Sequence, residues 1–91
     1  MQVSINGLTE KAYFELSEFC MRNHITTRNT HNVYRGKSGK AEQEFDIDFR
    51  IESDARVSIQ VRADFLWIFV HDVDEYCIRI HGTDFETVRI I

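Results

Sequence analysis

The sequence predicts an α+β fold in which one N-terminal helix packs on a curved, mostly antiparallel sheet of five to six strands (β-α-β-β-β-β-β). Two patterns carry this prediction: a single amphipathic stripe of helical spacing near the N-terminus, and alternation of apolar and polar residues through most of the remaining chain. At 91 residues the chain can build one hydrophobic core. We therefore expect residues 1–91 to form a single compact domain.

The N-terminal third predicts a strand, a helix and a loop. Apolar and polar residues alternate over residues 1–5, and Gly7 ends this strand. Thr9 suits the N-cap of a helix over residues 9–23. The apolar stripe of this helix consists of Ala12, Leu16, Phe19 and Cys20. Residues 24–32 are rich in Thr and Asn and have no periodicity, so we expect a loop there.

Strands joined by turns account for the middle of the chain. A short strand at residues 33–35 and a turn at residues 36–40 come first. The clearest alternation covers residues 44–52, and it predicts an antiparallel strand with one solvated face. Its apolar positions are Phe45, Ile47, Phe49 and Ile51. We expect this strand to form a hairpin with residues 57–61 through a turn at residues 53–55.

The C-terminal part predicts a central strand and one or two further elements. The apolar run of residues 65–70 lacks alternation, as expected of a strand covered on both faces or contributing to a subunit contact. Residues 76–81 alternate as a strand. Residues 85–91 close the chain as a strand or a short helix.

Charge is distributed unevenly along the chain. The net charge is −4, yet residues 19–41 hold five basic side chains and no acidic one. The other residues hold fifteen acids and six bases. We therefore expect an electrically two-sided surface, and the negative total argues against nucleic acid as the main partner.

One short string resembles the end of a phosphate-binding loop, Gly36-Lys37-Ser38. The full pattern requires a glycine five residues before Gly36, where this chain has His31. Such a loop also opens a helix, whereas the residues that follow here alternate as a strand. The string therefore predicts a hairpin turn and no nucleotide site.

The strand of residues 44–52 carries the first candidate binding site. Its face opposite the apolar residues presents Glu44, Asp46 and Asp48, about 6.5–7 Å apart along the strand. This spacing is comparable with that of phosphates along a nucleic-acid strand. We expect these acids to bind another protein, such as a component of a nucleic-acid-handling complex, by imitating its ligand.

Trp67 is the second candidate contact residue. It shares one face of the predicted central strand with Phe65 and Phe69. A single helix covers only part of such a sheet, so we expect this face to anchor a partner protein or a second copy in a homodimer.

An alternative hypothesis is that the basic hairpin of residues 28–40 binds nucleic acid. Basic side chains there would follow the phosphates and one aromatic ring would stack on a base. The residues assigned to this role are Arg28, Tyr34, Arg35, Lys37 and Lys40.

Metal, cofactor, catalytic and membrane roles receive no support from the sequence. Cys20 with His24, and Cys77 with His81, fall short of the ligand spacing of a structural zinc site. No catalytic signature is present, and the longest apolar run, residues 65–70, is far shorter than a membrane span. The N-terminus has no signal-peptide pattern and the two cysteines predict reduced thiols, so we expect a cytoplasmic protein.

The function expected from these observations is stoichiometric binding without chemistry. Small acidic α+β proteins that lack a catalytic signature include inhibitors of the antitoxin, immunity and phage counter-defence types. We expect this chain to act in that manner, by covering a functional surface of a target protein.

Overall fold

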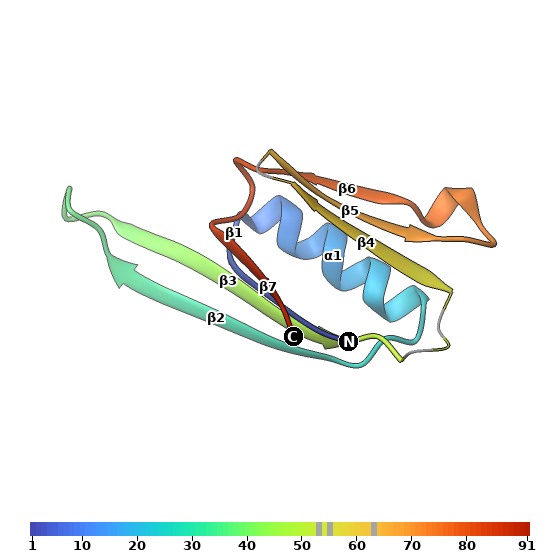
Figure 1. Ribbon diagram of the computed structural model, residues 1–91. Helices are drawn as coiled ribbons and strands as arrows, with labels where there is room; N and C mark the ends of the chain where they lie inside the picture. Colours follow the sequence, from blue (N-terminus) through green and yellow to red (C-terminus); the bar gives the residue numbers. More distant parts are fainter. Residues whose placement is uncertain (53, 55, 63) are drawn as a thin grey trace.

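The protein has an α+β fold in which one helix and two antiparallel sheets enclose a single core (Figure 1). The computed structural model describes all residues except 53, 55 and 63. Its elements are β1 (Gln2–Leu8), α1 (Glu10–Arg22), β2 (Thr27–Arg35), β3 (Ala41–Arg50), β4 (Val57–Arg62), β5 (Phe65–Val70), the 3-10 helix η1 (Asp74–Tyr76), β6 (Ile78–His81) and β7 (Thr87–Ile90).

In the described part of the chain, seven strands form two sheets, in place of the single sheet of five to six strands expected from the sequence. The first sheet has the order β2-β3-β1-β7 and the second the order β4-β5-β6, with antiparallel pairing throughout. The expected hairpin between residues 44–52 and 57–61 is therefore wrong. β3 pairs with β1 and β2, while β4 pairs with β5, so the chain changes sheets between β3 and β4. The turn expected at residues 53–55 includes two residues outside the described part of the chain.

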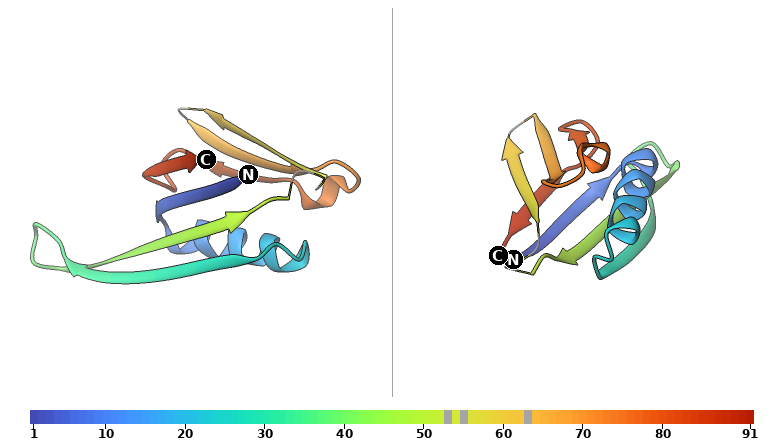
Figure 2. Two further views of the ribbon diagram at one scale, coloured as in Figure 1. Left: turned by 60° about the horizontal axis from the view of Figure 1, so that its bottom comes forward. Right: turned by 90° about the vertical axis from the view of Figure 1, so that its right-hand side faces the viewer.

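The core lies between the first sheet on one side and α1 with the second sheet on the other. β1 and β3 bury Ile5, Ile47 and Phe49, and β5 buries Leu66 and Ile68. The helix stripe expected from the sequence is buried: Ala12, Leu16, Phe19 and Cys20. Figure 2 shows α1 lying against β1 and β3, with the second sheet beside it on the same face.

The helix begins where its capping residue predicts. The Oγ1 of Thr9 accepts a hydrogen bond from the backbone N–H of Ala12 at 3.3 Å, and Glu10 lies in the first turn, where the helix dipole favours an acid. Near the other end, Arg22 donates a hydrogen bond to Glu18 at 2.5 Å across one turn. These local bonds fix the limits of α1, while its buried stripe fixes its position.

β1 continues through Gly7 instead of ending there. Its register with β3 shifts between Ile5 and Leu8, so that two residues of β1 oppose Asp46 of β3. Gly7 takes φ +69 in this bulge. Residues three apart in a regular strand point to opposite faces. The extra residue of the bulge reverses this alternation, so that Leu8 is buried on the same face as Ile5.

β2 occupies residues that lack a strand pattern. The loop expected at residues 24–32 is wrong from Thr27 onwards, because β2 pairs with β3 over nine successive positions. All residues from Arg28 to Arg35 are exposed, so neither face of β2 selects apolar side chains. The strand forms because β3 offers a regular edge.

The β2–β3 hairpin projects well beyond the core. The molecule measures 46 × 24 × 24 Å, and the long dimension follows this hairpin (Figure 2, left). At its tip, Gly36 N–H donates to the carbonyl of Lys40 at 2.8 Å, and Gly39 takes φ +79. The string Gly36-Lys37-Ser38 thus belongs to a hairpin turn. We call the hairpin of residues 27–50 the arm.

Gly7 and Gly39 provide a matched pair of substitutions. An alanine at Gly39 meets open space and suffers only the left-handed backbone, a cost of about 1 kcal/mol. An alanine at Gly7 has the same backbone cost, and its Cβ would lie 2.5 Å from Cγ of Glu86. We expect Gly7→Ala to lower the free energy of unfolding by about 2–3 kcal/mol in urea denaturation. Equal losses for the two variants would contradict the close packing of Glu86 against Gly7.

Candidate partner-binding surface

Three acids of β3 form a row on the open face of the first sheet. Glu44, Asp46 and Asp48 alternate with Phe45, Ile47 and Phe49, which are buried on the opposite face. This arrangement is the one expected from the alternation. We call Glu44, Asp46 and Asp48 the acidic row.

Hydrogen bonds hold two members of the acidic row in place. The Oγ of Ser4 donates to Oδ1 of Asp48 at 2.6 Å, and the backbone N–H of Gly7 donates to Oδ1 of Asp46 at 3.1 Å. The second bond depends on the bulge of β1. Both carboxylates are partly buried and keep their second oxygen for another donor.

Glu44 lies in a negative environment. Desolvation raises the pKa of its carboxyl above the usual value, and the charges of Asp46 and Glu86 raise it further. Glu86 comes from the segment before β7, where its N–H donates to the carbonyl of Asn6 at 3.0 Å. In the described part of the chain, no acid of the row forms an ion pair. No ion pair with a described residue therefore offsets the negative charge on Glu44, the member of the row nearest the tip of the hairpin.

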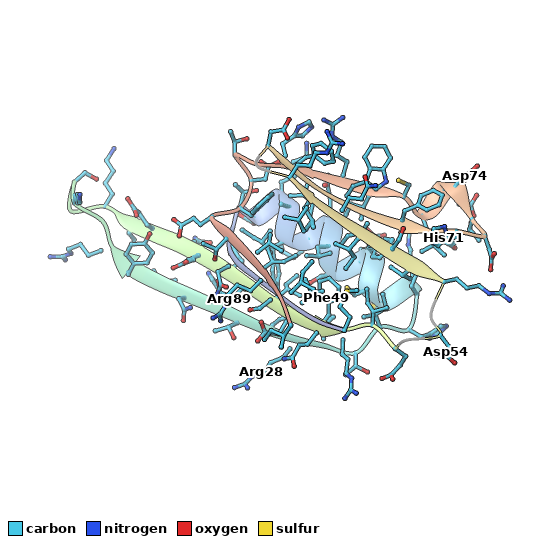
Figure 3. All side chains as sticks on the ribbon, in the orientation of Figure 1. Arg28, Phe49, Asp54, His71, Asp74 and Arg89 are labelled. Carbon is cyan, nitrogen blue, oxygen red and sulfur yellow. The ribbon has the colours of Figure 1, made fainter. Side chains whose placement is uncertain are left out.

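Arginines flank the acidic row at the base of the arm. Arg28 lies opposite Asp48 on β2, and Arg89 lies opposite Ser4 on β7. Figure 3 shows both arginines at the four-stranded sheet, away from the three-stranded one. Towards the tip, Glu42 and Glu44 continue the negative charge on β3. The face is thus mixed at its base and acidic along the arm.

The fold separates the residues expected to bind nucleic acid into two places on β2 and the hairpin tip. Arg35, Lys37 and Lys40 lie together at the tip of the arm. Arg28 is seven residues from Arg35 along β2, roughly 23 Å away at strand spacing. The tip is therefore a basic cluster that Arg28 does not join.

Tyr34 belongs to the acidic face and not to the basic tip. It lies opposite Glu42 in the β2–β3 register. Glu42 raises the pKa of the Tyr34 hydroxyl, first by accepting its hydrogen bond and then by its charge. The ring of Tyr34 is consequently held beside a carboxylate.

Trp67 lies on a separate surface, the outer face of the second sheet. Its neighbours on β5, Leu66 and Ile68, point into the core, so Trp67 faces outward with Phe65 and is half-buried. The guanidinium of Arg79 lies 4.6 Å from the centroid of the Phe65 ring and 6.0 Å from that of Trp67. The acidic row and Trp67 therefore occupy opposite outer faces and cannot contact the same small epitope.

Several surface residues that bear on binding have no signal in the sequence. Glu86 joins the acidic face only because β7 pairs with β1, a contact between distant segments. Phe14 and Met21 of α1 remain 58% and 72% exposed, although they belong to an amphipathic helix. Their spacing of seven residues could have revealed a second apolar stripe beside the buried one.

The described residues offer no group of three His, Cys, Asp or Glu side chains arranged to hold a metal ion. Cys20 is buried and Cys77 is partly buried, and both are free thiols. Within the same part of the chain, no helix is long and apolar enough to cross a membrane. Comparison of the chain with protein-family models, curated proteins and solved structures gives no significant match.

Glu44 gives a pH-dependent prediction. Its pKa is raised in the folded protein, so its contribution to stability is present below pH 4.5 and is lost as the pH rises through the folded-state pKa. Glu44→Gln removes the charge. We expect this variant to unfold at higher urea concentration than the wild type at pH 7, and the gain to vanish near pH 4.

The control for this experiment is Glu75→Gln, which removes a carboxylate from η1, outside the acidic face. It should not reproduce the gain in stability of Glu44→Gln at pH 7, because Glu75 lies outside the acidic row and its neighbours. A wild type that is more stable than Glu44→Gln at pH 7 would show that a cation compensates Glu44.

Proposed function

We propose that this chain is a small non-enzymatic binding protein that inhibits another protein by covering one of its functional surfaces. The observation that carries the proposal is the acidic row on an open sheet face, none of whose carboxylates forms an ion pair with a described residue. Partial burial raises the pKa of Glu44, and the neighbouring charges of Asp46 and Glu86 raise it further, so the fold gains nothing from holding this carboxylate in its charged form. A basic partner surface would relieve this repulsion on binding.

The partner proposed on these grounds is a protein with a basic groove, of the kind that handles nucleic acid. The acidic row repeats at about 6.5–7 Å, and Ser4 and Gly7 hold two of its carboxylates in fixed positions. Preorganised charge favours fast, specific association. Inhibitors of the antitoxin, immunity and phage counter-defence types act in this manner, and we propose the cytoplasm as the site of action.

Charge reversal at Glu44 tests the acidic row. No hydrogen bond from the described part of the fold holds Glu44, so Glu44→Lys alters the surface without removing a contact that supports β1. A tagged wild-type protein should capture a target from a lysate of the source organism. We expect Glu44→Lys to weaken the captured complex at least tenfold in surface plasmon resonance, mainly through slower association.

Glu15→Lys is the matched control, because it makes the same charge change on the exposed side of α1. It should reduce affinity by less than twofold. Equal losses of affinity for Glu15→Lys and Glu44→Lys would show that the loss arises from net charge alone. An unchanged affinity for Glu44→Lys would refute the acidic row as the contact surface.

The second candidate function is nucleic-acid binding through the tip of the arm. The observation in its favour is the cluster of Arg35, Lys37 and Lys40 on a projecting hairpin, where a groove or a strand can be reached without obstruction. The acids along the rest of the arm oppose this function, since they would repel the adjoining phosphates.

Electrophoretic mobility of short single-stranded and double-stranded DNA and RNA at low salt tests this candidate. If the tip binds, the wild type should retard the probe and the double variant Lys37→Glu/Lys40→Glu should not. Unchanged mobility with the wild type removes the candidate. Retardation that survives in the double variant assigns binding to other residues.

A further inference from the structure

β2 is an unprotected edge strand. It pairs with β3 alone and runs for nine residues without a shift in register. It contains no proline, glycine or lysine, and its residues from Arg28 to Arg35 are all exposed. Edge strands usually carry a bulge, a proline or a lysine that prevents pairing with another strand. β2 has no bulge, proline or lysine, and its charged residues, Arg28 and Arg35, lie near its two ends.

The backbone groups on the free edge of β2 can be assigned from the hairpin. Gly36 N–H bonds to Lys40, so the even-numbered residues of β2 direct their backbone groups towards β3. The odd-numbered residues direct theirs outward because antiparallel pairs alternate. Five residues therefore present N–H and C=O groups to an incoming strand: Thr27, Asn29, His31, Val33 and Arg35.

Exposed apolar side chains lie on the helix side of this edge. Phe14 and Met21 of α1 flank a groove with Ile25, Thr27 and Asn29, and Asn29 donates a hydrogen bond to Ser17 at 3.3 Å. Val33, further along β2 on the same face, is 61% exposed. Phe14, Met21 and Val33 are the large apolar residues of this face that the fold leaves uncovered.

We propose that two copies of this chain pair through β2, antiparallel about a two-fold axis at His31, to form one continuous eight-stranded sheet. In this register all five outward-facing residues of each β2 pair with a residue of the other copy. Shifting the register by two residues in either direction reduces the number of paired residues. An antiparallel two-fold seam also puts both α1 helices on the same face of the sheet.

The same register brings the uncovered apolar groups together. Val33 pairs with Asn29 of the second copy, whose side chain bonds to Ser17 of α1 between Phe14 and Met21. The Val33 side chain therefore enters the groove of the second copy. This pairing explains why the arm projects beyond its own core, because the far half of each β2 lies beside the core of the other copy.

Charge also favours this register. Arg35 pairs with Thr27 of the second copy, and Thr27 lines the same groove as Glu18, which already bonds to Arg22. Arg28 lies opposite Tyr34 and not opposite a second arginine. Nine residues at about 3.3 Å each make a seam of roughly 30 Å, sufficient with the two helices for an interface of about 800 Å² per copy. The acidic row stays on the outer face, so this proposal is independent of the target.

Sedimentation and size-exclusion chromatography with light scattering test the dimer directly. We expect the wild type to have twice the monomer mass of 10.8 kDa. Val33→Lys should shift it to the monomer with an unchanged circular dichroism spectrum. Val61→Lys is the matched control, because Val61 is an exposed strand valine (43%) of β4 in the other sheet. A monomeric wild type at high concentration, or a dimer lost only in Val61→Lys, overturns the proposal.

Cross-linking tests the register in a Cys77→Ser background. Cys20 is fully buried, which raises the pKa of its thiol to about 12 and keeps it unreactive. Two copies of residue 30 lie two positions apart along the seam, roughly 7 Å, whereas two copies of residue 37 lie roughly 40 Å apart. A short bismaleimide should link Thr30→Cys dimers and leave Lys37→Cys unlinked. A dimer that Thr30→Cys fails to link, or that both variants link equally, overturns the proposed seam.

Discussion

The alternation along β3 is the constraint on which the rest of the structure depends. Phe45, Ile47 and Phe49 are buried on one face, and burial of each such side chain stabilises a fold by about 1.5–3 kcal/mol. That burial fixes which face of β3 meets α1 and the second sheet. The same alternation leaves Glu44, Asp46 and Asp48 on the opposite face. Core and candidate binding surface are therefore two sides of one strand.

β3 also determines what lies beside it. It pairs with β1 on one edge and with β2 on the other, so it is the strand through which the arm joins the core. β2 has no buried face of its own and is held by backbone hydrogen bonds to β3. Near its tip the arm is consequently exposed on both faces, whereas its base buries Phe45, Ile47 and Phe49. The tip therefore serves binding better than it serves stability.

Much of the fold follows from local pattern. The helix limits, the Thr9 cap, the strand at β3 and the exposed acids were all predictable, because side-chain periodicity and capping act within a few residues. The division into two sheets was not, since alternation records which face is buried and not which strand lies alongside. β2 escaped prediction because a strand exposed on both faces has no apolar period. Glu86 and the separation of Arg28 from the tip depend on pairings between distant segments.

Residue-resolved amide hydrogen exchange by NMR tests the central role of β3 most directly. At concentrations where the protein is monomeric, we expect the slowest exchange in β1 and β3, around Ile5 and Ile47, where both neighbouring strands and the core give protection. In β2 we expect alternation, with the amides of Thr30 and Asn32 protected and those of Asn29 and His31 exchanging quickly. Uniformly fast exchange through β2, or exchange in β3 no slower than in its surroundings, would contradict the central role of β3.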